Sequence, residues 1–462
     1  MGSIFVIFGA TGDLMTKKLV PALYELYRKK MLPPLFQIVG FSRREITPAE
    51  FQKQIEGIIT SGAKDVSHAA AFAKLFTYTQ GVFDSKEAYQ SLAEYLGRKD
   101  GEWRLCSNKL FYLAVPPEHY GTIFENLKGS GLTIPCSPEE GWTRVIVEKP
   151  FGKDLKTAEA LDRQLGNLFK EEQIYRIDHY LGKETVENIL AFRFSNSFLA
   201  PAWNRENIES IHLAFFEKDG VEHRGEFYDS VGALRDVGQN HLLQLLALLT
   251  MEAPAEFTAD GIRHERERAL ASLRAMSPEE VRQDTMRGQY AGYESVKGVR
   301  PGSETETYFK IKTTLDAGRF EGVPVVLEGG KALGEDRVEA VITFRHSSPC
   351  LCPPGIHSKN TLHYEIKPQE GIRMSFWVKR PGAEMKIEEK DFSFDYAKAY
   401  PKEEFLDAYE KLLLNVIRGD QALFVSTAEI AASWKFIDRI TEEWEKGAPP
   451  LRRYEPGCVD VE

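Results

Sequence analysis

An acid, a histidine, a tyrosine and a lysine crowd into the nonapeptide RIDHYLGKE, residues 176–184. In an extended chain, neighbouring side chains point to opposite faces, so Asp178 and His179 would face different partners. Asp178 could orient another histidine, as a carboxylate does when it fixes an imidazole tautomer. His179, Tyr180 and Lys183 would donate hydrogen bonds to an anion such as a phosphate. A salt-bridged surface strand is the alternative for a generic acid–histidine pair.

A histidine that Asp178 could orient lies in the segment VGALRDVGQNHLLQLLALLT, which predicts a long helix near residues 231–250. Helical spacing places His241 in line with apolar residues of this segment, namely Leu234, Val237, Leu245 and Leu248. Such a ring is either a satisfied core histidine or a base that points into a pocket. Asp236 and Asn240, four residues apart, bring further polar groups to a neighbouring face.

The stretch GATGDLMTKK, residues 9–18, lies between a predicted strand and a predicted helix. Gly9 and Gly12 allow a tight turn and a close approach of the backbone to a pyrophosphate, and the helix N-terminus offers free N–H groups. The third glycine of the usual fingerprint is absent, but the position between strand and helix favours a dinucleotide loop. The predicted coenzyme contacts in it are Gly9, Ala10, Thr11, Gly12, Asp13 and Leu14.

The segment FSRRE, residues 41–45, ends the second predicted strand. An acid at this position would bind the ribose hydroxyls of NAD, whereas the chain has Ser42, Arg43 and Arg44, which suit the 2′-phosphate of NADP. The sequence therefore predicts NADP as the coenzyme, with NAD as a weaker alternative.

The elements that hold these residues show two different patterns along the chain, one of alternating strands and helices and one of successive strands. In the first third, apolar runs at 3–9, 36–41, 109–115 and 144–149 alternate with helical segments, at about 16–30 and after a capping box at Thr47–Glu50. Such alternation predicts a doubly wound, Rossmann-like α/β sheet. Strand-like runs between 307 and about 394 are separated by no long helix and predict an antiparallel sheet. Two closing helices are expected at 402–418 and 427–445.

We therefore expect two domains. Residues 1–174 would form the NADP-binding Rossmann-like domain, and residues 175–462 a larger β+α domain for substrate binding and oligomerisation. The fold class is α/β plus α+β.

The composition excludes several classes of protein. A net charge of −10 argues against general nucleic-acid binding, which needs a basic surface. No apolar run approaches the roughly 18 residues of a membrane span. Five scattered cysteines, among them Cys350 and Cys352, predict neither a disulfide framework nor a metal site, and favour a reduced, cytoplasmic protein.

The nonapeptide, together with GATGDL and VEKPFG, resembles the glucose-6-phosphate dehydrogenase family. The resemblance spans nearly the whole chain and includes YLAVPP, RGEFYD, NHLLQ and GGKAL in the same order. It implies a Rossmann-like domain followed by a β+α domain. It also implies oxidation of β-D-glucose 6-phosphate at C1 to 6-phosphoglucono-1,5-lactone with hydride transfer to NADP, the first step of the oxidative pentose phosphate pathway.

The resemblance also implies roles for single residues. His241 matches the general base and Asp178 the carboxylate that supports it. The phosphate contacts are His179, Tyr180 and Lys183. The sugar-hydroxyl contacts are Glu217 and Asp236, and Lys331 matches a further substrate lysine. Lys18 and Lys149 match lysines at the junction of coenzyme and substrate, and Pro150 a proline that helps to set the two domains. Arg43 matches the 2′-phosphate contact, and Tyr120 a coenzyme-side tyrosine.

The chain departs from the family pattern after Lys331. Members commonly carry a second basic residue five positions later, where this chain has Asp336 followed by Arg337. No counterpart of the structural NADP site of some members is found. A homodimer or homotetramer is expected, with the exposed face of the antiparallel sheet as the dimer contact.

Two other functions are alternatives for this sequence. A sugar oxidoreductase of the glucose–fructose oxidoreductase type also pairs a Rossmann domain with a sheet domain, but lacks the nonapeptide. A non-catalytic sensor of NADP or sugar phosphate would bind without turnover, which retention of His241 and Asp178 disfavours.

Overall fold

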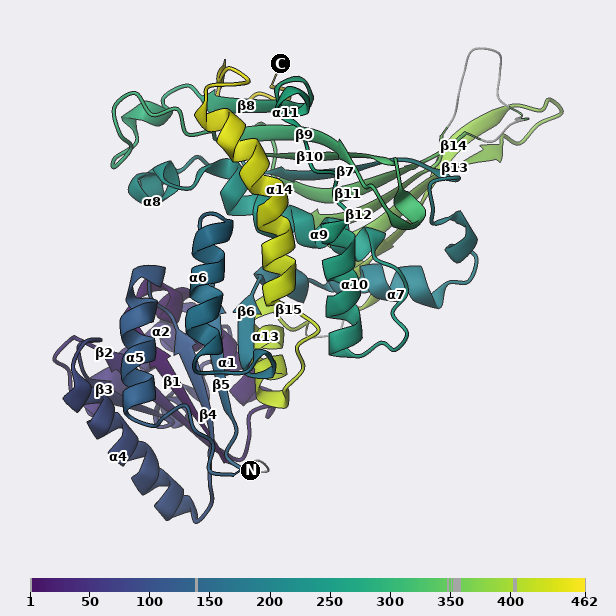
Figure 1. Cartoon of the computed structure of the whole chain (residues 1–462). Helices are drawn as coiled ribbons and strands as arrows, with labels where there is room; N and C mark the ends of the chain where they lie inside the picture. The colour runs from purple at the N-terminus through teal and green to yellow at the C-terminus, as the bar shows by residue number, and fades with distance from the viewer. Residues whose placement is uncertain are drawn as a thin grey trace. The chain divides into compact units, whose positions relative to one another are not determined.

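The chain folds into two compact units. The computed structural model describes residues 2–137, 140–346, 349, 351, 359–401 and 405–461. The first unit comprises Met1–Gly152, Lys156–Gly182 and Phe405–Thr427, and the second comprises Lys153–Leu155, Lys183–Glu404 and Ala428–Glu462. The predicted boundary between residues 174 and 175 does not match this division, because the chain returns to the first unit after residue 404 (Figure 1).

A seven-stranded sheet forms the centre of the first unit, in the order β15-β6-β5-β4-β1-β2-β3. The strands are β1 (Gly2–Phe8), β2 (Leu35–Ser42), β3 (Phe76–Gln80), β4 (Asn108–Leu113), β5 (Thr143–Glu148), β6 (Ile174–Ile177) and β15 (Phe424–Val425). All neighbours pair in parallel except β15, which is antiparallel to β6. Strand β1 is buried along its whole length, as expected for a central strand of a doubly wound sheet.

Helices pack on this sheet: η1 (Met15–Leu19), α1 (Val20–Arg28), α2 (Pro48–Gly62), α3 (Ala69–Ala73), α4 (Lys86–Trp103), α5 (Tyr120–Gly129), α6 (Leu155–Gly166) and α13 (Ala408–Arg418). Short 3₁₀ turns are η2 (Pro117–His119), η3 (Glu171–Gln173) and η4 (His179–Gly182). The predicted capping box of α2 is confirmed, since the Thr47 hydroxyl accepts from the Glu50 N–H and the Glu50 carboxylate accepts from the Thr47 N–H. The predicted helix at 16–30 differs at its start, because η1 is a π-helix.

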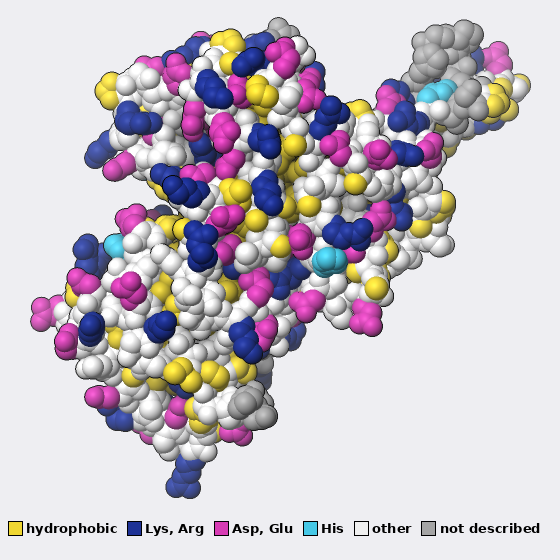
Figure 2. Space-filling view, in the orientation of Figure 1, with side chains coloured by type: hydrophobic (Ala, Val, Ile, Leu, Met, Phe, Trp, Pro, Cys, Tyr) yellow, Lys and Arg dark blue, Asp and Glu magenta, His cyan; other side chains and the backbone are white. Residues whose placement is uncertain are grey.

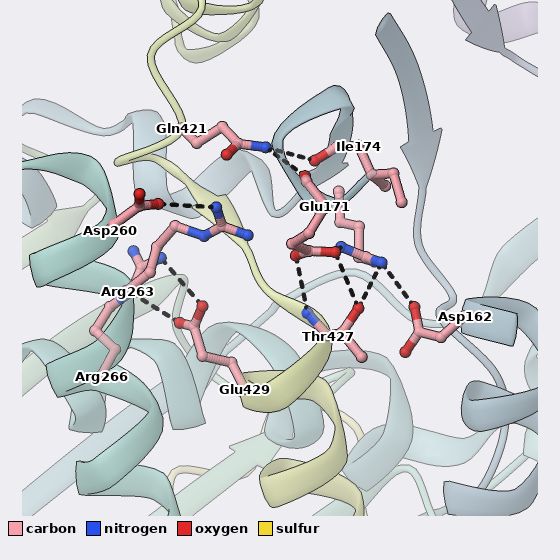
Figure 3. Close-up of polar contacts among 10 residues, drawn as sticks. Asp162, Glu171, Ile174, Asp260, Arg263, Arg266, Gln421, Thr427 and Glu429 are labelled. Atoms are coloured by element: carbon pink, nitrogen blue, oxygen red, sulfur yellow. Dashed lines mark hydrogen bonds and ion pairs between the residues drawn. The ribbon is translucent and has the colours of Figure 1, made fainter. Parts of the chain in front are cut away.

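A buried arginine fixes strand β6. Arg176 is 1 % exposed and donates to Glu171, to Asp162 of α6 and to the hydroxyl of Thr427 (Figure 3). A buried guanidinium needs such partners, because leaving its charge unpaired away from water is costly. The network therefore ties β6, which contains the first two residues of the nonapeptide, to its neighbours.

A nine-stranded sheet forms the second unit, in the order β14-β13-β12-β11-β7-β10-β9-β8-β16. The strands are β7 (Ile208–Phe216), β8 (Thr285–Tyr290), β9 (Tyr308–Thr314), β10 (Pro324–Gly330), β11 (Arg337–Phe344), β12 (Thr361–Lys367), β13 (Gly371–Lys379), β14 (Ile387–Asp395) and β16 (Arg452–Tyr454). Pairing is antiparallel except between β10 and β7 and between β16 and β8. The prediction of a mainly antiparallel sheet is confirmed.

The helices of the second unit are α7 (Glu184–Ser195), α8 (Gly225–Asp229), η7 (Leu234–Leu242), α9 (Leu243–Thr250), α10 (Ala259–Ala271), α11 (Pro278–Asp284), α12 (Tyr396–Ala399) and α14 (Thr427–Glu445). Its 3₁₀ turns are η5 (Ala200–Ala202), η6 (Glu222–Arg224), η8 (Tyr293–Ser295) and η9 (Gly318–Phe320). Arg266 of α10 and Glu429 of α14 form an ion pair, with 2.8 Å between Nε and Oε1 (Figure 3). Their side chains are 1 % and 0 % exposed, respectively.

Several expectations are corrected by the structure. The predicted helix near 231–250 contains the π-helix η7, and the predicted helix at 402–418 begins at Ala408, residues 402–404 lying outside the described part. Cys106 and Cys136 form a disulfide, so the expectation of a fully reduced chain is wrong for this pair. Cys350 and Cys352 lie outside the described residues.

The surface is mixed in charge. On the face shown in Figure 2, Lys and Arg side chains are interspersed with Asp and Glu. Within the described part of the chain, no helix is both long and apolar enough to cross a membrane.

Candidate active site

The loop after β1 lines a cavity of about 580 Å³ in the first unit. Gly9 has a φ of +83°, and a Cβ on it would lie 2.4 Å from the carbonyl oxygen of Ala114. The Gly12 N–H donates to the Gly9 carbonyl at 2.9 Å and closes the turn. Only glycine fits such a position, because an L side chain would be strained and would collide with the backbone of Ala114, just after β4. Gly9, Thr11 and Gly12 all line the cavity.

The end of β2 forms the second wall of this cavity, with Ser42, Arg43 and Arg44. The hydroxyls of Thr11 and Ser42 lie 2.9 Å apart, and the Tyr78 hydroxyl donates to the carbonyls of Ser42 and Arg44 at 2.9 and 2.6 Å. These bonds fix the backbone from which both exposed arginine side chains leave. Arg43, the predicted contact for a 2′-phosphate, lines this cavity, and Arg44 lines it as well.

Other predicted coenzyme residues lie away from the cavity lining. Asp13 is largely exposed and pairs with Lys17 at 2.8 Å, four residues later. The hydrogen bond from Lys17 lowers the pKa of Asp13. Ala10 is buried in the core, and Leu14 packs against that core. Tyr120 and Lys149 are not among the lining residues either.

Sequence reasoning missed the third wall of the cavity. Phe83, Asp84, His119 and Thr122 line it. The rings of Phe83 and His119 lie 5.2 Å apart and offer an aromatic surface. The available signal was position, because residues 81–84 follow the carboxyl end of β3, where ligands of doubly wound sheets bind.

At the end of β5, the Glu148 carboxylate is surrounded by tyrosines. It accepts from the hydroxyls of Tyr112 and Tyr409, the latter at 3.2 Å, while the Tyr120 hydroxyl donates to the Glu148 carbonyl at 3.4 Å. Burial raises the pKa of Glu148, and the hydrogen bonds from Tyr112 and Tyr409 oppose that change. Lys149 follows directly, with a cis bond to Pro150.

Tyr409 of α13 connects residues from distant parts of the first unit. The ring of His179 stacks on it at 6.1 Å and 23°, and the Lys18 ammonium lies 5.8 Å from its centre. His179 also contacts Tyr180, with ring centres 4.9 Å apart. Two predicted substrate residues, Lys18 and His179, are therefore brought together by a tyrosine that sequence reasoning did not select.

The nonapeptide is less extended than predicted. Strand β6 ends at Ile177, and His179–Gly182 forms the 3₁₀ turn η4. Asp178 is 1 % exposed, and its carboxylate accepts from the Tyr180 N–H at 3.0 Å, an interaction that starts the turn. Strand alternation therefore does not separate Asp178 from His179.

His241 lies on the π-helix η7 of the second unit. The ring is 1 % exposed and stacks on Phe215 of β7, with centres 5.8 Å apart and 16° between planes. Bonds of a π-helix join residues five apart, so Asp236 and His241 stand one turn apart. The predicted α-helical line of His241 with Leu234 and Leu245 is therefore replaced by a different register, of a kind that recurs at functional sites.

Glu217 and Lys331 form an ion pair at 2.5 Å at the ends of β7 and β10. The Lys331 ammonium also lies 5.5 Å from the ring centre of Tyr228. Burial and then the charges of Asp236 and other acids, including Glu217, raise the pKa of Tyr228 well above its ordinary value. Three predicted substrate contacts, Glu217, Asp236 and Lys331, thus gather around a buried tyrosine.

Lys183 begins α7 in the second unit, and its ammonium lies 3.4 Å from the Glu370 carboxylate. The Thr185 N–H donates to the same carboxylate at 3.0 Å. Glu370 belongs to the turn between β12 and β13, so Lys183 is held at the carboxyl end of β12.

Comparison with known proteins covers both units. The family profile described as "Glucose-6-phosphate dehydrogenase, NAD binding domain" matches residues 6–188, and "Glucose-6-phosphate dehydrogenase, C-terminal domain" matches residues 190–461. A glucose-6-phosphate 1-dehydrogenase of Aggregatibacter actinomycetemcomitans is 40 % identical over 98 % of this chain and 92 % of its own. Glucose-6-phosphate 1-dehydrogenase 2 of Mycobacterium tuberculosis is 37 % identical over 98 % and 90 %.

A solved structure described as "Glucose-6-phosphate dehydrogenase in complex with its substrate glucose-6-phosphate" superposes with a TM-score of 0.92 at 35 % identity, covering 100 % of this chain and 96 % of that one. A 3-ketoreductase of Actinomadura kijaniata, at 13 % identity and a TM-score of 0.51 over 98 % and 99 % of the two chains, shares the fold alone. Both family profiles, the full-length identity and the superposition agree. The chain belongs to the glucose-6-phosphate dehydrogenase family.

Proposed function

We propose that the protein oxidises β-D-glucose 6-phosphate at C1 to 6-phosphoglucono-1,5-lactone, with NADP as the hydride acceptor. The observation that carries this proposal is the full-length superposition on a dehydrogenase described with glucose-6-phosphate as its substrate.

His241 is the proposed general base. Oxidation of a hemiacetal requires loss of the C1 hydroxyl proton as hydride leaves the same carbon, and an imidazole near neutral pKa is suited to accept it. Asp178 is proposed to stabilise the imidazolium that results, as a carboxylate does beside a histidine base. Phe215 supports this role for His241, because a ring stacked against it restricts its orientation.

His179, Tyr180 and Lys183 are proposed to hold the phosphate of the substrate, and we call them the phosphate clamp. The phosphate is remote from C1, so binding it aligns the sugar for reaction. Glu217 and Asp236 are proposed to contact the sugar hydroxyls, and Lys331 is proposed as a further substrate contact. The gathering of these three residues around Tyr228 supports that proposal.

The cavity of the first unit fits a nicotinamide dinucleotide. Gly9 offers a close approach of the backbone, and the exposed Arg43 and Arg44 offer a positive rim for a 2′-phosphate. When bound, the nicotinamide accepts the hydride. Arg43 would select NADP over NAD, Thr11 and Gly12 would hold the pyrophosphate, and the Phe83–His119 pair would exclude water from one wall of the cavity.

Assembly and location are part of the same proposal. We expect a homodimer or homotetramer in the cytoplasm, which light scattering of the purified protein and fractionation of the source cells would test. Plant relatives described as cytoplasmic support the location.

An initial-rate assay tests the proposed function. Purified protein is given glucose 6-phosphate with NADP, then with NAD, and formation of the reduced coenzyme is followed by absorbance. The expected result is turnover with both, with a higher kcat/KM for NADP. Binding of NADP and glucose 6-phosphate without turnover would favour the sensor, and turnover of free sugars alone would favour another sugar oxidoreductase.

A further inference from the structure

The ammonium of Lys331 is held by two side chains of the second unit. It pairs with the Glu217 carboxylate at 2.5 Å and lies 5.5 Å from the centre of the Tyr228 ring, and these are its contacts within the described residues. The backbone of Lys331 is fixed separately, because its N–H donates to the Thr307 carbonyl at 2.9 Å and its carbonyl accepts from the Tyr454 hydroxyl at 2.7 Å. The position of the ammonium therefore depends on Glu217 and Tyr228.

Glu217 is itself a proposed substrate contact. Its side chain is 28 % exposed, and an ion pair with a partly exposed carboxylate is weak. A carboxylate that accepts a hydrogen bond from a sugar hydroxyl also attracts a neighbouring ammonium less strongly, because its charge is shared. Tyr228 is 1 % exposed, so the contact of its ring with Lys331 is shielded from water. The ring therefore holds the ammonium whether or not Glu217 is engaged by a ligand.

The packing of its neighbours fixes the ring of Tyr228. It makes an edge contact with the ring of Tyr293, with centres 6.3 Å apart and 67° between the planes. The Tyr293 hydroxyl donates to the carboxylate of Asp229, the residue after Tyr228, at 3.1 Å, and the Arg300 guanidinium donates to the same carboxylate at 2.7 Å. The ring is therefore in place before any ligand binds, which lowers the entropic cost of orienting Lys331.

The hydroxyl of Tyr228 is not part of this contact. It is buried and has no hydrogen-bond partner among the described residues. Burial raises the pKa of Tyr228 well above its ordinary value, so the phenol stays neutral and does not cancel the charge of Lys331. The negative face of a neutral aromatic ring attracts an ammonium without neutralising it.

We propose that Tyr228 is a positioning residue of the substrate site, whose ring holds the ammonium of Lys331 by a cation–π contact while Glu217 binds a sugar hydroxyl. The proposal rests on the function proposed above. Tyr228 acts through Lys331 and not by touching the substrate, because its side chain is buried beneath the ammonium.

Removal of the ring should weaken substrate binding. Tyr228→Leu should raise the KM for glucose 6-phosphate about 5- to 10-fold, the scale of a shielded cation–π contact, and change kcat much less. Tyr228→Phe keeps the ring and removes only a buried hydroxyl without a partner, so it should keep the KM within about twofold of wild type and should not lower the melting temperature. Steady-state kinetics with NADP in excess and thermal unfolding measure these effects.

A double-mutant cycle tests whether the ring acts through the ammonium. Lys331→Met keeps a side chain of similar length without the charge, and should itself lower kcat/KM for glucose 6-phosphate. In the Lys331→Met background, Tyr228→Leu should lower kcat/KM by less than about twofold further, because the cation that the ring holds is gone. A ring that only fills the core would cost the same factor in both backgrounds.

A second variant keeps the core filled. Pentafluorophenylalanine at position 228 retains the shape of the ring but withdraws the negative charge from its face, on which the cation–π attraction depends. It should raise the KM as Tyr228→Leu does, whereas Tyr228→Phe should not. This comparison of two rings holds even where the cavity left by Tyr228→Leu unfolds the protein.

Tyr364→Leu is the matched control. Tyr364 of β12 is also buried, its hydroxyl also has no partner within the described part of the chain, and its ring contacts Phe192 with centres 6.1 Å apart. Its loss should lower the melting temperature through the cavity that it leaves. The kcat/KM for glucose 6-phosphate should stay unchanged.

The outcomes separate this inference from the proposed function. Wild-type protein that does not oxidise glucose 6-phosphate would overturn the proposed function. Wild-type turnover with equal losses from Tyr228→Leu in the presence and absence of the Lys331 charge would overturn the role of Tyr228 alone. A KM for the pentafluorophenylalanine protein equal to that of Tyr228→Phe would overturn it as well.

Discussion

The ring of His179 stacks on the ring of Tyr409, with centres 6.1 Å apart and 23° between the planes, although 230 residues separate them in the chain. The hydroxyl of Tyr409 donates to the Glu148 carboxylate, and its ring faces the ammonium of Lys18. The returning helix α13 therefore orients two residues that belong to the proposed substrate site. The histidine of the phosphate clamp depends on a segment far outside its own motif.

Replacement of Tyr409 should affect substrate binding through its ring. Tyr409→Leu should raise the KM for glucose 6-phosphate about tenfold, since stacking and cation–π contacts are each worth about 0.5–1.5 kcal/mol. Tyr409→Phe keeps the ring and should stay within about threefold of wild type. Steady-state kinetics of both variants would give the KM for glucose 6-phosphate, and thermal unfolding would check that both variants fold. Equal effects of the two changes would assign the role to the hydroxyl and Glu148.

Arg43 should determine coenzyme preference. Arg43→Ala should weaken NADP binding by about 1–3 kcal/mol, the scale of a hydrogen bond to a charged group, and leave NAD nearly unaffected because NAD lacks the 2′-phosphate. Titration of both coenzymes by fluorescence measures this. Arg98→Ala, which removes a surface arginine of α4, is the control. Parallel loss of NAD and NADP binding would show that Arg43 supports the fold instead.

Glu328 in the nine-stranded sheet should stabilise the protein in a pH-dependent manner. Burial opposes ionisation, but hydrogen bonds from His212 and Tyr308 and the charge of Lys310 lower the pKa of Glu328 from 4.5 to about 2. Because the pKa is lower in the folded protein, acidification protonates this carboxylate in the unfolded protein at a higher pH than in the folded protein. The extra stability is therefore present above pH 4.5 and is lost as the pH falls towards about 2.

Glu328→Gln should accordingly destabilise the protein by about 3 kcal/mol at pH 7. The difference from wild type should shrink as the pH is lowered from 4.5 towards 2. Urea unfolding at several pH values gives this difference. The exposed Glu321, changed to Gln, serves as the control and should give a small and nearly constant difference. A Glu328→Gln difference that does not vary with pH would refute the assignment.

Local signals predicted much of the fold and of the turn after β1. The capping box of Thr47 and Glu50 involves only neighbours in the chain, and Gly9 is required by the backbone turn that it makes. Apolar runs with short connections likewise identified the central parallel strands, such as β1 and β4. These features depend on a few consecutive residues, which is why the sequence alone reveals them.

Features that depend on distant contacts could not be predicted. The π-helix around His241 follows the same residue pattern as an α-helix, and its extra residue per turn is stabilised by packing such as that on Phe215. Tyr409 carries no motif of its own. Cys106 and Cys136 are 30 residues apart without a framework spacing, and sheet topology brings them together. The pairing of Lys367 with Asp336 likewise requires the register of β11 and β12.

In the proposed reaction, His241 takes the proton from the C1 hydroxyl. The most direct measurement compares kcat of His241→Asn with that of wild type, using glucose 6-phosphate and NADP at saturation, together with the Kd for glucose 6-phosphate. A general-base role for His241 predicts a fall in kcat of at least about 100-fold, the lower end of general-base contributions, with the Kd nearly unchanged. Near-normal kcat in the variant would contradict it.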